Sequence, residues 1–197
     1  MKERRSYTMT ARADRTSATK DRIARAAMGL FLAEAFDDVT LARIASAAGV
    51  SHQTVLNHFE SKEGVVLGVA EILREETSDV RGRAIPGDVP GAVAALVNDY
   101  ERLGDANVRW VAASERWVHL ATLLDDARAQ HQQWIVAMFG AQLPTTPAAR
   151  RRAVLAVHAA TDVYTWKLLR RDLGLSRAET ERIIVDLVVG IIERKKP

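Results

Sequence analysis

Polar side chains that can bind nucleic-acid bases and phosphates are concentrated at residues 51–58, which read Ser-His-Gln-Thr-Val-Leu-Asn-His. Amide and imidazole groups can pair with base edges in the major groove of DNA, and hydroxyl groups can donate to phosphate oxygens. If this stretch is a short helix, it projects five polar side chains outward: His52, Gln53, Thr54, Asn57 and His58. The pattern therefore predicts a surface that reads DNA.

The residues before this stretch have the composition of the turn in a helix-turn-helix. Ala45 is small enough to let a second helix cross closely, and Gly49 supplies the positive φ that a tight interhelical turn needs. Ser51 can accept backbone N–H bonds at the next helix start, while Val50 and Val55 would point into the core. The alternative is a plain helical hairpin with a glycine turn.

Hydrophobic spacing predicts helices along the whole chain, with breaks at Gly104 and Gly174. The expected helices cover about residues 17–35, 41–48, 51–58, 61–80, 90–103, 106–140, 147–172 and 176–194. Thr40 is a good N-cap, and residues 81–91, with two prolines and three glycines, form the clearest linker. No segment alternates with a period of two for long enough to be a strand. We therefore predict an all-α fold of about nine helices.

Positive charge is concentrated at the N-terminal end. Residues 1–62 hold 10 Lys and Arg against 7 Asp and Glu, whereas residues 63–197 hold 18 of each. This distribution favours contact with a polyanion through the front of the chain. Residues 1–16 lack a hydrophobic period and are expected to form a flexible basic arm. The chain has no cysteine, no signal-peptide pattern and no membrane-length apolar stretch, so we expect a cytoplasmic protein without membrane contact.

Three segments around the turn resemble the TetR-type (tetracycline-repressor-like) transcriptional regulators: Thr40-Leu-Ala-Arg-Ile-Ala45, Ala48-Gly-Val-Ser51 and His58-Phe-Glu-Ser-Lys-Glu63. The resemblance implies a three-helix helix-turn-helix domain over residues 17–62. A connecting helix at about 61–80 would join it to a helical ligand-binding and dimerisation domain over residues 63–197. The resemblance also implies a sequence-specific regulator: a homodimeric repressor that a small, largely apolar ligand releases from a palindromic operator in double-stranded DNA.

Position and resemblance together predict the residues that contact DNA. They are Thr40, Arg43, Ser51, His52, Gln53, Thr54, Asn57, His58 and Lys62. Two residues depart from the family pattern: Gln53 replaces a usual Gly or Ala, and Leu56 replaces a usual Tyr that helps to hold a phosphate. Gln53 could pair with an adenine through two hydrogen bonds. Arg12 and Arg15 could follow the minor groove from the arm, or belong to a solvated tail.

The resemblance implies an inducer cavity in the C-terminal domain, where all four tryptophans lie. Its predicted lining is Tyr100, Trp110, Ser114, Trp117, His119, Trp134, Met138, Phe139, His158 and Asp162. The alternative for the aromatic residues is ordinary core. His158 and Asp162 are one helical turn apart and could instead form a salt bridge or a subunit contact. Glu115 and His119 have the spacing of a metal-binding pair, but two exposed residues are usually solvated, so we expect no metal and no cofactor.

The last two predicted helices are apolar on more than one side, and a second subunit would cover the side that the chain's own core does not. The resembling family dimerises through a four-helix interface of this kind. The predicted interface residues are Tyr164, Trp166, Leu169, Ile184, Leu187, Val188 and Ile191. A two-fold dimer suits a palindromic site.

Two other classes of function are alternatives. A helical enzyme would need a nucleophile with its base, a phosphate-binding glycine loop or an H-E-x-x-H helix, and the sequence has none of these. We therefore predict no enzymatic activity. A constitutive architectural DNA-binding protein that responds to no ligand is the second alternative.

Overall fold

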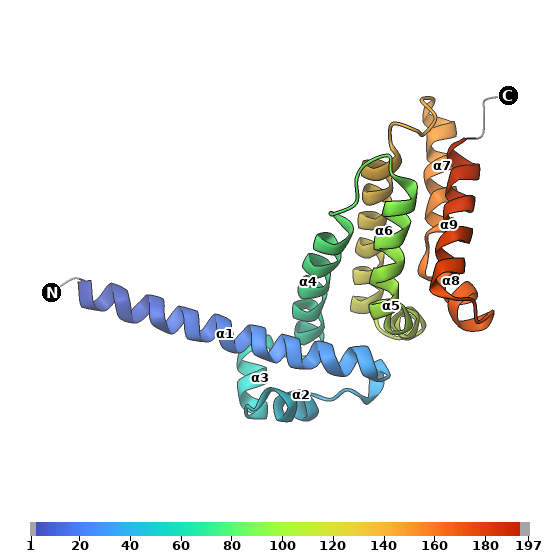
Figure 1. Cartoon of the computed structure of the whole chain (residues 1–197). Helices are drawn as coiled ribbons and strands as arrows, with labels where there is room; N and C mark the ends of the chain where they lie inside the picture. The colour runs from blue at the N-terminus through green and yellow to red at the C-terminus, as the bar shows by residue number, and fades with distance from the viewer. Residues whose placement is uncertain (1–2, 194–197) are drawn as a thin grey trace. The chain divides into compact units, whose positions relative to one another are not determined.

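The computed structural model describes residues 3–193 and places them in helices joined by short loops (Figure 1). The α-helices are α1 (Glu3–Ala33), α2 (Leu41–Ala48), α3 (His52–Phe59), α4 (Lys62–Arg81), α5 (Val89–Ser114), α6 (Val118–Phe139), α7 (Pro147–Ala160), α8 (Val163–Lys167) and α9 (Arg177–Ile192). A 3₁₀ turn lies at Phe36–Asp38 and a π-helical turn at Leu168–Asp172. This part of the chain contains no strand, which confirms the all-α prediction, and none of its helices is long and apolar enough to cross a bilayer.

The chain divides into two compact units, residues 1–73 and 74–197. In the first unit α1 packs on α2, and α2 packs on α3. Phe31 from α1 stacks on Phe36 from the 3₁₀ turn, with 5.3 Å between ring centroids. Ile44 of α2 and Val55 of α3 have no exposed surface. These side chains form the core that holds the two short helices in place. Each of these helices has eight residues and needs such packing, because an isolated helix of this length is not stable in water.

Helix α1 is longer than the sequence pattern indicated. Residues 3–16, which we predicted as a flexible arm, continue α1 back to Glu3. They contain no glycine or proline, so nothing in this segment interrupts a helix. Hydrophobic periodicity fails to detect such a segment because it registers the burial of one face, and residues 14–18 are exposed.

The second unit is a helical bundle around α5, which packs against α6, α8 and α9, while α7 packs against α6 and α9 (Figure 1). Leu96, Ile135, Val157 and Ile184 come from four different helices and have no exposed surface. The bundle thus has a continuous apolar core to which every long helix of the unit contributes.

The helix break expected at Gly104 is wrong, since α5 runs through this residue to Ser114. A Cβ atom at position 104 would collide with the ring of Trp166, whose indole is completely buried. Position 104 is a glycine because α5 and α8 approach each other closely at this point. Helix α5 continues through it because a glycine keeps the backbone hydrogen bonds of a helix. The break lies instead between α5 and α6, at residues 115–117.

Candidate nucleic-acid interface

The turn between α2 and α3 is built as the sequence indicated. The Thr40 hydroxyl accepts a hydrogen bond from the backbone N–H of Arg43 and caps α2. Gly49 ends α2 in the left-handed conformation with φ of 63°. The Ser51 hydroxyl accepts from the N–H of Thr54, 3.1 Å away, and caps α3. Two caps and one left-handed residue therefore fix the angle at which α3 leaves the turn.

Helix α3 is divided into a buried and a polar side. Val55 and Phe59 are buried against the rest of the unit. The exposed polar residues are Ser51, His52, Gln53 and Asn57, and the half-buried ones are Thr54 and His58. Leu56, which replaces the usual Tyr, is also half-buried. Between residues 51 and 59 there is no acidic side chain, so α3 itself places no negative charge against a phosphate.

Hydrogen bonds order two pairs of side chains on this surface. Gln53 Nε2 donates to Asn57 Oδ1 at 3.0 Å, one helical turn further along α3. The hydroxyls of Ser51 and Thr54 lie 2.8 Å apart and are bonded to each other. The surface therefore presents amide groups with a defined orientation, while the Thr54 hydroxyl is engaged with the cap.

Arg43, predicted as a DNA contact, is exposed and forms hydrogen bonds to other residues of the first unit. Its guanidinium forms a two-pronged ion pair with Glu34, the residue that follows α1, in which Nη2 and Oε1 are 2.7 Å apart. Its Nη1 also donates to the backbone oxygen of Asp38 at 3.1 Å. The hydrogen bonds from Arg43 lower the pKa of the Glu34 carboxyl. Arg43 thus links α2 to the residue after α1, and its contact with the DNA backbone stays a prediction.

Lys62 is likewise engaged within its own unit. Its Nζ donates to the backbone oxygen of Phe36 at 2.6 Å and lies 4.4 Å from the centre of the Phe36 ring. Partial burial lowers the pKa of this ammonium group. Lys62 therefore fastens the start of α4 to the 3₁₀ turn, and its role on DNA stays a prediction.

The two arginines of the predicted arm lie on α1. Arg15 is exposed, whereas the side chain of Arg12 lies outside the described residues. Their contact with the minor groove stays a prediction.

The predicted ligand-contacting residues of the second unit separate into three groups. Tyr100, Met138 and Phe139 are buried in the bundle core. The Tyr100 hydroxyl donates to the backbone oxygen of Thr161 at 3.0 Å, and burial raises the pKa of Tyr100 to about 12. The half-buried residues are Trp110, Ser114, Trp117, Trp134, His158 and Asp162, and His119 is exposed. The set therefore does not gather around one described cavity, and its part in ligand binding stays a prediction.

A buried polar network that the sequence pattern missed joins α4, α5 and α6. Arg81 Nη2 lies 2.8 Å from Asp99 Oδ2, and the Asp99 side chain is 2% exposed. Arg81 Nη1 lies 3.1 Å from His131 Nδ1, and His131 Nε2 lies 2.9 Å from Thr161 Oγ1. A buried ion pair with further hydrogen bonds is stable only as a set, because removing one partner leaves a buried charge uncompensated. No local sequence signal identifies the network, since its members are 18 to 80 positions away from one another along the chain.

The donors in this network fix the tautomer of His131. Arg81 can only donate, so His131 Nδ1 must accept and Nε2 must carry the proton. Nε2 then donates to Thr161, whose hydroxyl donates to the backbone oxygen of Val157 at 2.7 Å. Burial, with the charge of Arg81, holds the pKa of His131 well below its usual range, and the ring stays neutral.

His158 lies against the same network. Its ring meets that of His131 edge-on, with 4.9 Å between centroids, and its Nε2 lies 3.5 Å from Asp162 Oδ2. The structure thus brings His158 and Asp162 together, as one of the sequence alternatives held. The ring of Trp134 also stacks on the ring of His131, with 5.6 Å between centroids.

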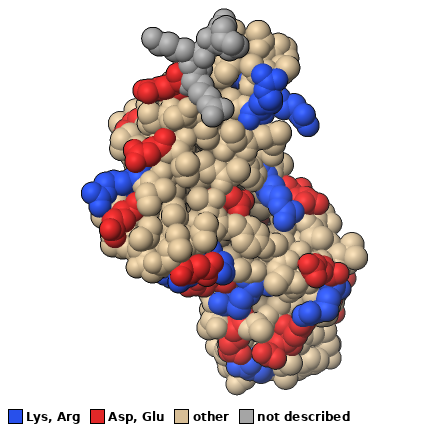
Figure 2. Space-filling model, turned by 90° about the vertical axis from the view of Figure 1, so that its right-hand side faces the viewer, with Lys and Arg blue, Asp and Glu red and all other residues tan. Residues whose placement is uncertain are grey.

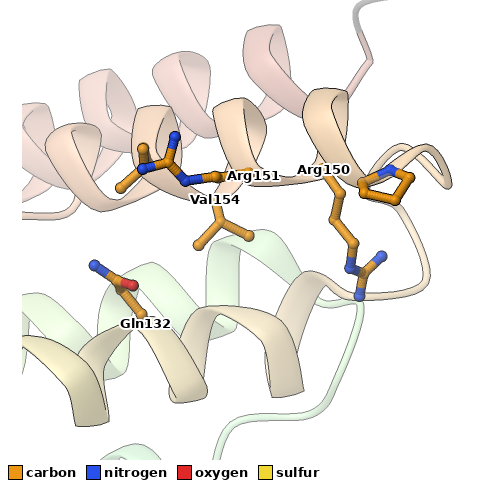
Figure 3. A pocket seen from close by; sticks show the side chains of 6 residues that line it. Gln132, Arg150, Arg151 and Val154 are labelled. Carbon is orange, nitrogen blue, oxygen red and sulfur yellow. The ribbon is translucent and has the colours of Figure 1, made fainter.

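A surface hollow of about 540 Å³ lies between α6 and α7 (Figure 3). Its lining is Gln132, Pro147, Arg150, Arg151, Val154 and Leu155. None of these residues belongs to the predicted inducer lining. In Figure 3 the Gln132 side chain rises from α6 toward Val154 and Arg151 on α7.

The outer face of α7, α8 and α9 is poor in charge. Figure 2 shows a broad area without Lys, Arg, Asp or Glu on the side of the second unit where these helices lie. Four large apolar side chains are exposed on α7, α8, α9 and the π-helical turn: Leu155 (44%), Tyr164 (51%), Leu168 (49%) and Leu187 (44%). We call these four residues the apolar face.

The predicted dimer residues divide between this face and the core. Trp166, Ile184 and Val188 have no exposed surface, and Leu169 is 8% exposed. Their side chains fill the chain's own bundle, which corrects the prediction that they meet a partner. Tyr164 and Leu187 are exposed and Ile191 is half-buried, so these three are available for an interface.

Comparison with known proteins agrees with the geometry of the turn. Residues 23–69 match the family described as bacterial regulatory proteins, tetR family. No curated protein matches the chain.

Three solved structures show a similar fold. A transcriptional regulator from Rhodococcus sp. is 15% identical, with a TM-score of 0.72 over 90% of this chain and 99% of its own. A tetR-family transcriptional regulator from Streptomyces coelicolor is 20% identical, with a TM-score of 0.70 over 87% and 81%. The multidrug binding protein EbrR, solved in complex with imidazole, is 14% identical, with a TM-score of 0.62 over 84% and 87%. The chain therefore has the fold of a transcriptional regulator, with a helix-turn-helix of the tetR family at its front.

Proposed function

Because residues 23–69 belong to the tetR family of bacterial regulatory proteins, we propose that the protein is a sequence-specific transcriptional repressor rather than an enzyme. One observation carries the proposal above all: the exposed polar side of α3, which follows the left-handed Gly49 and bears no acidic residue. A helix of eight residues fits the major groove, and amide and imidazole groups can read base edges there.

The repressor acts as a homodimer on a palindromic operator. The apolar face supports this, because four large apolar side chains exposed on α7 to α9 lose water contact when a second copy covers them. Tyr164 and Leu168 are one turn apart, and Leu187 and Ile191 are one turn apart on α9, so each pair forms a ridge. Two helices from each subunit would build a four-helix interface.

A small, largely apolar ligand releases the repressor from DNA. The support lies in Trp134, which is half-buried and stacks on His131, and whose Nε1 lies 3.4 Å from the backbone oxygen of Arg81. A ligand that displaces this indole disturbs the network that holds the last turn of α4. Helix α4 carries residues of both units, so the disturbance reaches the DNA-binding unit along one continuous helix. By linkage, a tenfold loss of DNA affinity requires tenfold weaker ligand binding to the DNA-bound form, about 1.4 kcal/mol.

Selection of binding sites from a pool of randomised DNA duplexes tests the function. The full chain is expected to enrich one palindromic sequence with two half-sites about one helical turn apart. A pool that stays random after several rounds would contradict sequence-specific binding and favour an architectural DNA-binding protein.

The release mechanism has a separate test. Small apolar compounds are screened for those that raise the melting temperature of the protein, and each is then titrated into the protein–operator complex. Compounds that stabilise the protein are expected to weaken operator binding. If every stabilising compound leaves operator affinity unchanged, ligand release is wrong.

A further inference from the structure

The pair formed by Gln53 and Asn57 gives the proposed DNA-reading surface a specific chemical preference, and the inference rests on the proposed function. Both side chains are exposed on α3 and lie one helical turn apart. They are joined by a hydrogen bond from Gln53 Nε2 to Asn57 Oδ1 of 3.0 Å. Neighbouring Thr54 does not compete for either amide, because its hydroxyl is bonded to Ser51.

The direction of this hydrogen bond determines what Gln53 can still offer. A glutamine amide has two N–H donors and one carbonyl oxygen, and Asn57 occupies one of the donors. The remaining N–H and Oε1 form a donor next to an acceptor. Adenine presents the complementary pair in the major groove, with N7 as acceptor and the N6 amino group as donor. Guanine presents two acceptors there and cannot pair with both groups.

We propose that Gln53 reads an adenine in each half-site and that Asn57 is a positioning residue that orients the Gln53 amide for this purpose. If Asn57 instead donated to Gln53 Oε1, that oxygen would keep only one free lone pair and the amide would turn away from the orientation that pairs with adenine. Asn57 thus orients the Gln53 amide without touching the base. Holding the amide in place before binding also reduces the entropy lost when the contact forms.

The test uses the full chain and the operator enriched from the randomised pool. Dissociation constants are measured by fluorescence anisotropy for this operator and for duplexes in which one base pair is changed symmetrically in both half-sites. The wild type is expected to lose at least about tenfold in affinity when one particular A·T pair is replaced. Gln53→Ala is expected to abolish this preference and to keep the preferences at all other positions.

Variants of Asn57 separate positioning from simple contact. Asn57→Leu cannot accept a hydrogen bond, so the preference for adenine at the same position should fall several-fold. Asn57→Asp keeps the acceptor but adds a negative charge, so it should weaken binding to every sequence while it retains the adenine preference. The double variant Gln53→Ala with Asn57→Leu should lose no more of this preference than Gln53→Ala alone. Gln133→Ala on α6 is the matched control and should bind as the wild type does.

Two results would overturn the inference while the proposed function stands. One is a Gln53→Ala variant that weakens all sequences equally, and the other is an Asn57→Leu variant that keeps the full preference for adenine. If no sequence is enriched at all, the proposed function fails and this inference fails with it.

Discussion

Two cations of the first unit, Arg43 and Lys62, bind neighbouring groups of that unit. Both were predicted to contact the DNA backbone, Lys62 from the resemblance and Arg43 from its position, and both are bonded to neighbours within their own unit. Their types and positions could be read from the sequence, but their partners could not. Glu34 lies nine positions before Arg43, and the backbone oxygen of Phe36 lies 26 positions before Lys62, so only the folded unit brings them together.

The clamp between Arg43 and Glu34 makes a first prediction. Glu34→Gln removes the carboxylate that holds the guanidinium, so the melting temperature of the protein should fall, as measured by circular dichroism. Glu75→Gln, at an exposed position on α4, is the control and should leave the melting temperature unchanged. Equal melting temperatures for both variants would show that Arg43 does not hold the unit together.

The buried histidine makes a second prediction, on pH. In the folded state the pKa of His131 lies well below the ordinary 6.5, because burial and Arg81 oppose protonation. The unfolded chain therefore binds this proton first as the pH falls, and the stabilisation that is present above pH 6.5 is lost below it. The loss is at most about 1.4 kcal/mol per pH unit for one proton.

Urea unfolding between pH 7.5 and 5.0 measures this effect. Other groups contribute to the wild-type curve, so the test compares it with that of His131→Gln. The variant should lose less unfolding free energy over this pH range than the wild type. Parallel curves would contradict the assignment of a neutral, buried His131.

Whole elements were predictable where the sequence carries a burial pattern or a cap. The limits of α2 and α3 follow from Thr40, Gly49 and Ser51, and the structure confirms these caps. Residues 3–16 gave no signal because their sequence has no hydrophobic period. The break predicted at Gly104 was wrong because this glycine makes room for the ring of Trp166 on another helix. The local sequence around residue 104 carries no sign of that contact.

Packing of α5 against α8 makes a third prediction. Gly104→Ala places a methyl group against the buried indole of Trp166 and should lower the unfolding free energy by about 1–3 kcal/mol. Gly29→Ala in α1 meets open space and should raise stability by about 0.5–1 kcal/mol, because alanine favours the helix. Denaturant unfolding of both variants gives the comparison. A Gly104→Ala variant as stable as Gly29→Ala would contradict the close approach of the two helices.

At the scale of the whole molecule, the sequence predicted a partner for the last helices but named several wrong residues for it. Periodicity shows that α9 is apolar on more than one side, yet it cannot tell which side the chain's own bundle covers. The structure assigns Trp166, Ile184 and Val188 to the core and leaves Tyr164 and Leu187 exposed.

Dimerisation through the apolar face makes a fourth prediction. Leu187→Glu places a charge where a second copy would exclude water, so a dimer should dissociate to monomers without loss of helix content. Light scattering after size-exclusion chromatography measures the mass. Ile85→Glu, an exposed apolar position outside this face, should keep the wild-type mass. A Leu187→Glu variant that stays dimeric would place the interface elsewhere.

Operator binding by α3 is the central claim, and one titration tests it most directly. The protein is titrated with its enriched operator at two salt concentrations, with excess unrelated DNA as competitor, beside a variant with Ala at positions 52, 53 and 57. The wild type is expected to bind tightly in the presence of competitor and to weaken steeply as salt rises, whereas the variant should lose its preference for the operator. A variant that binds the operator with unchanged affinity and preference would contradict the account, because the exposed side of α3 would then not read DNA.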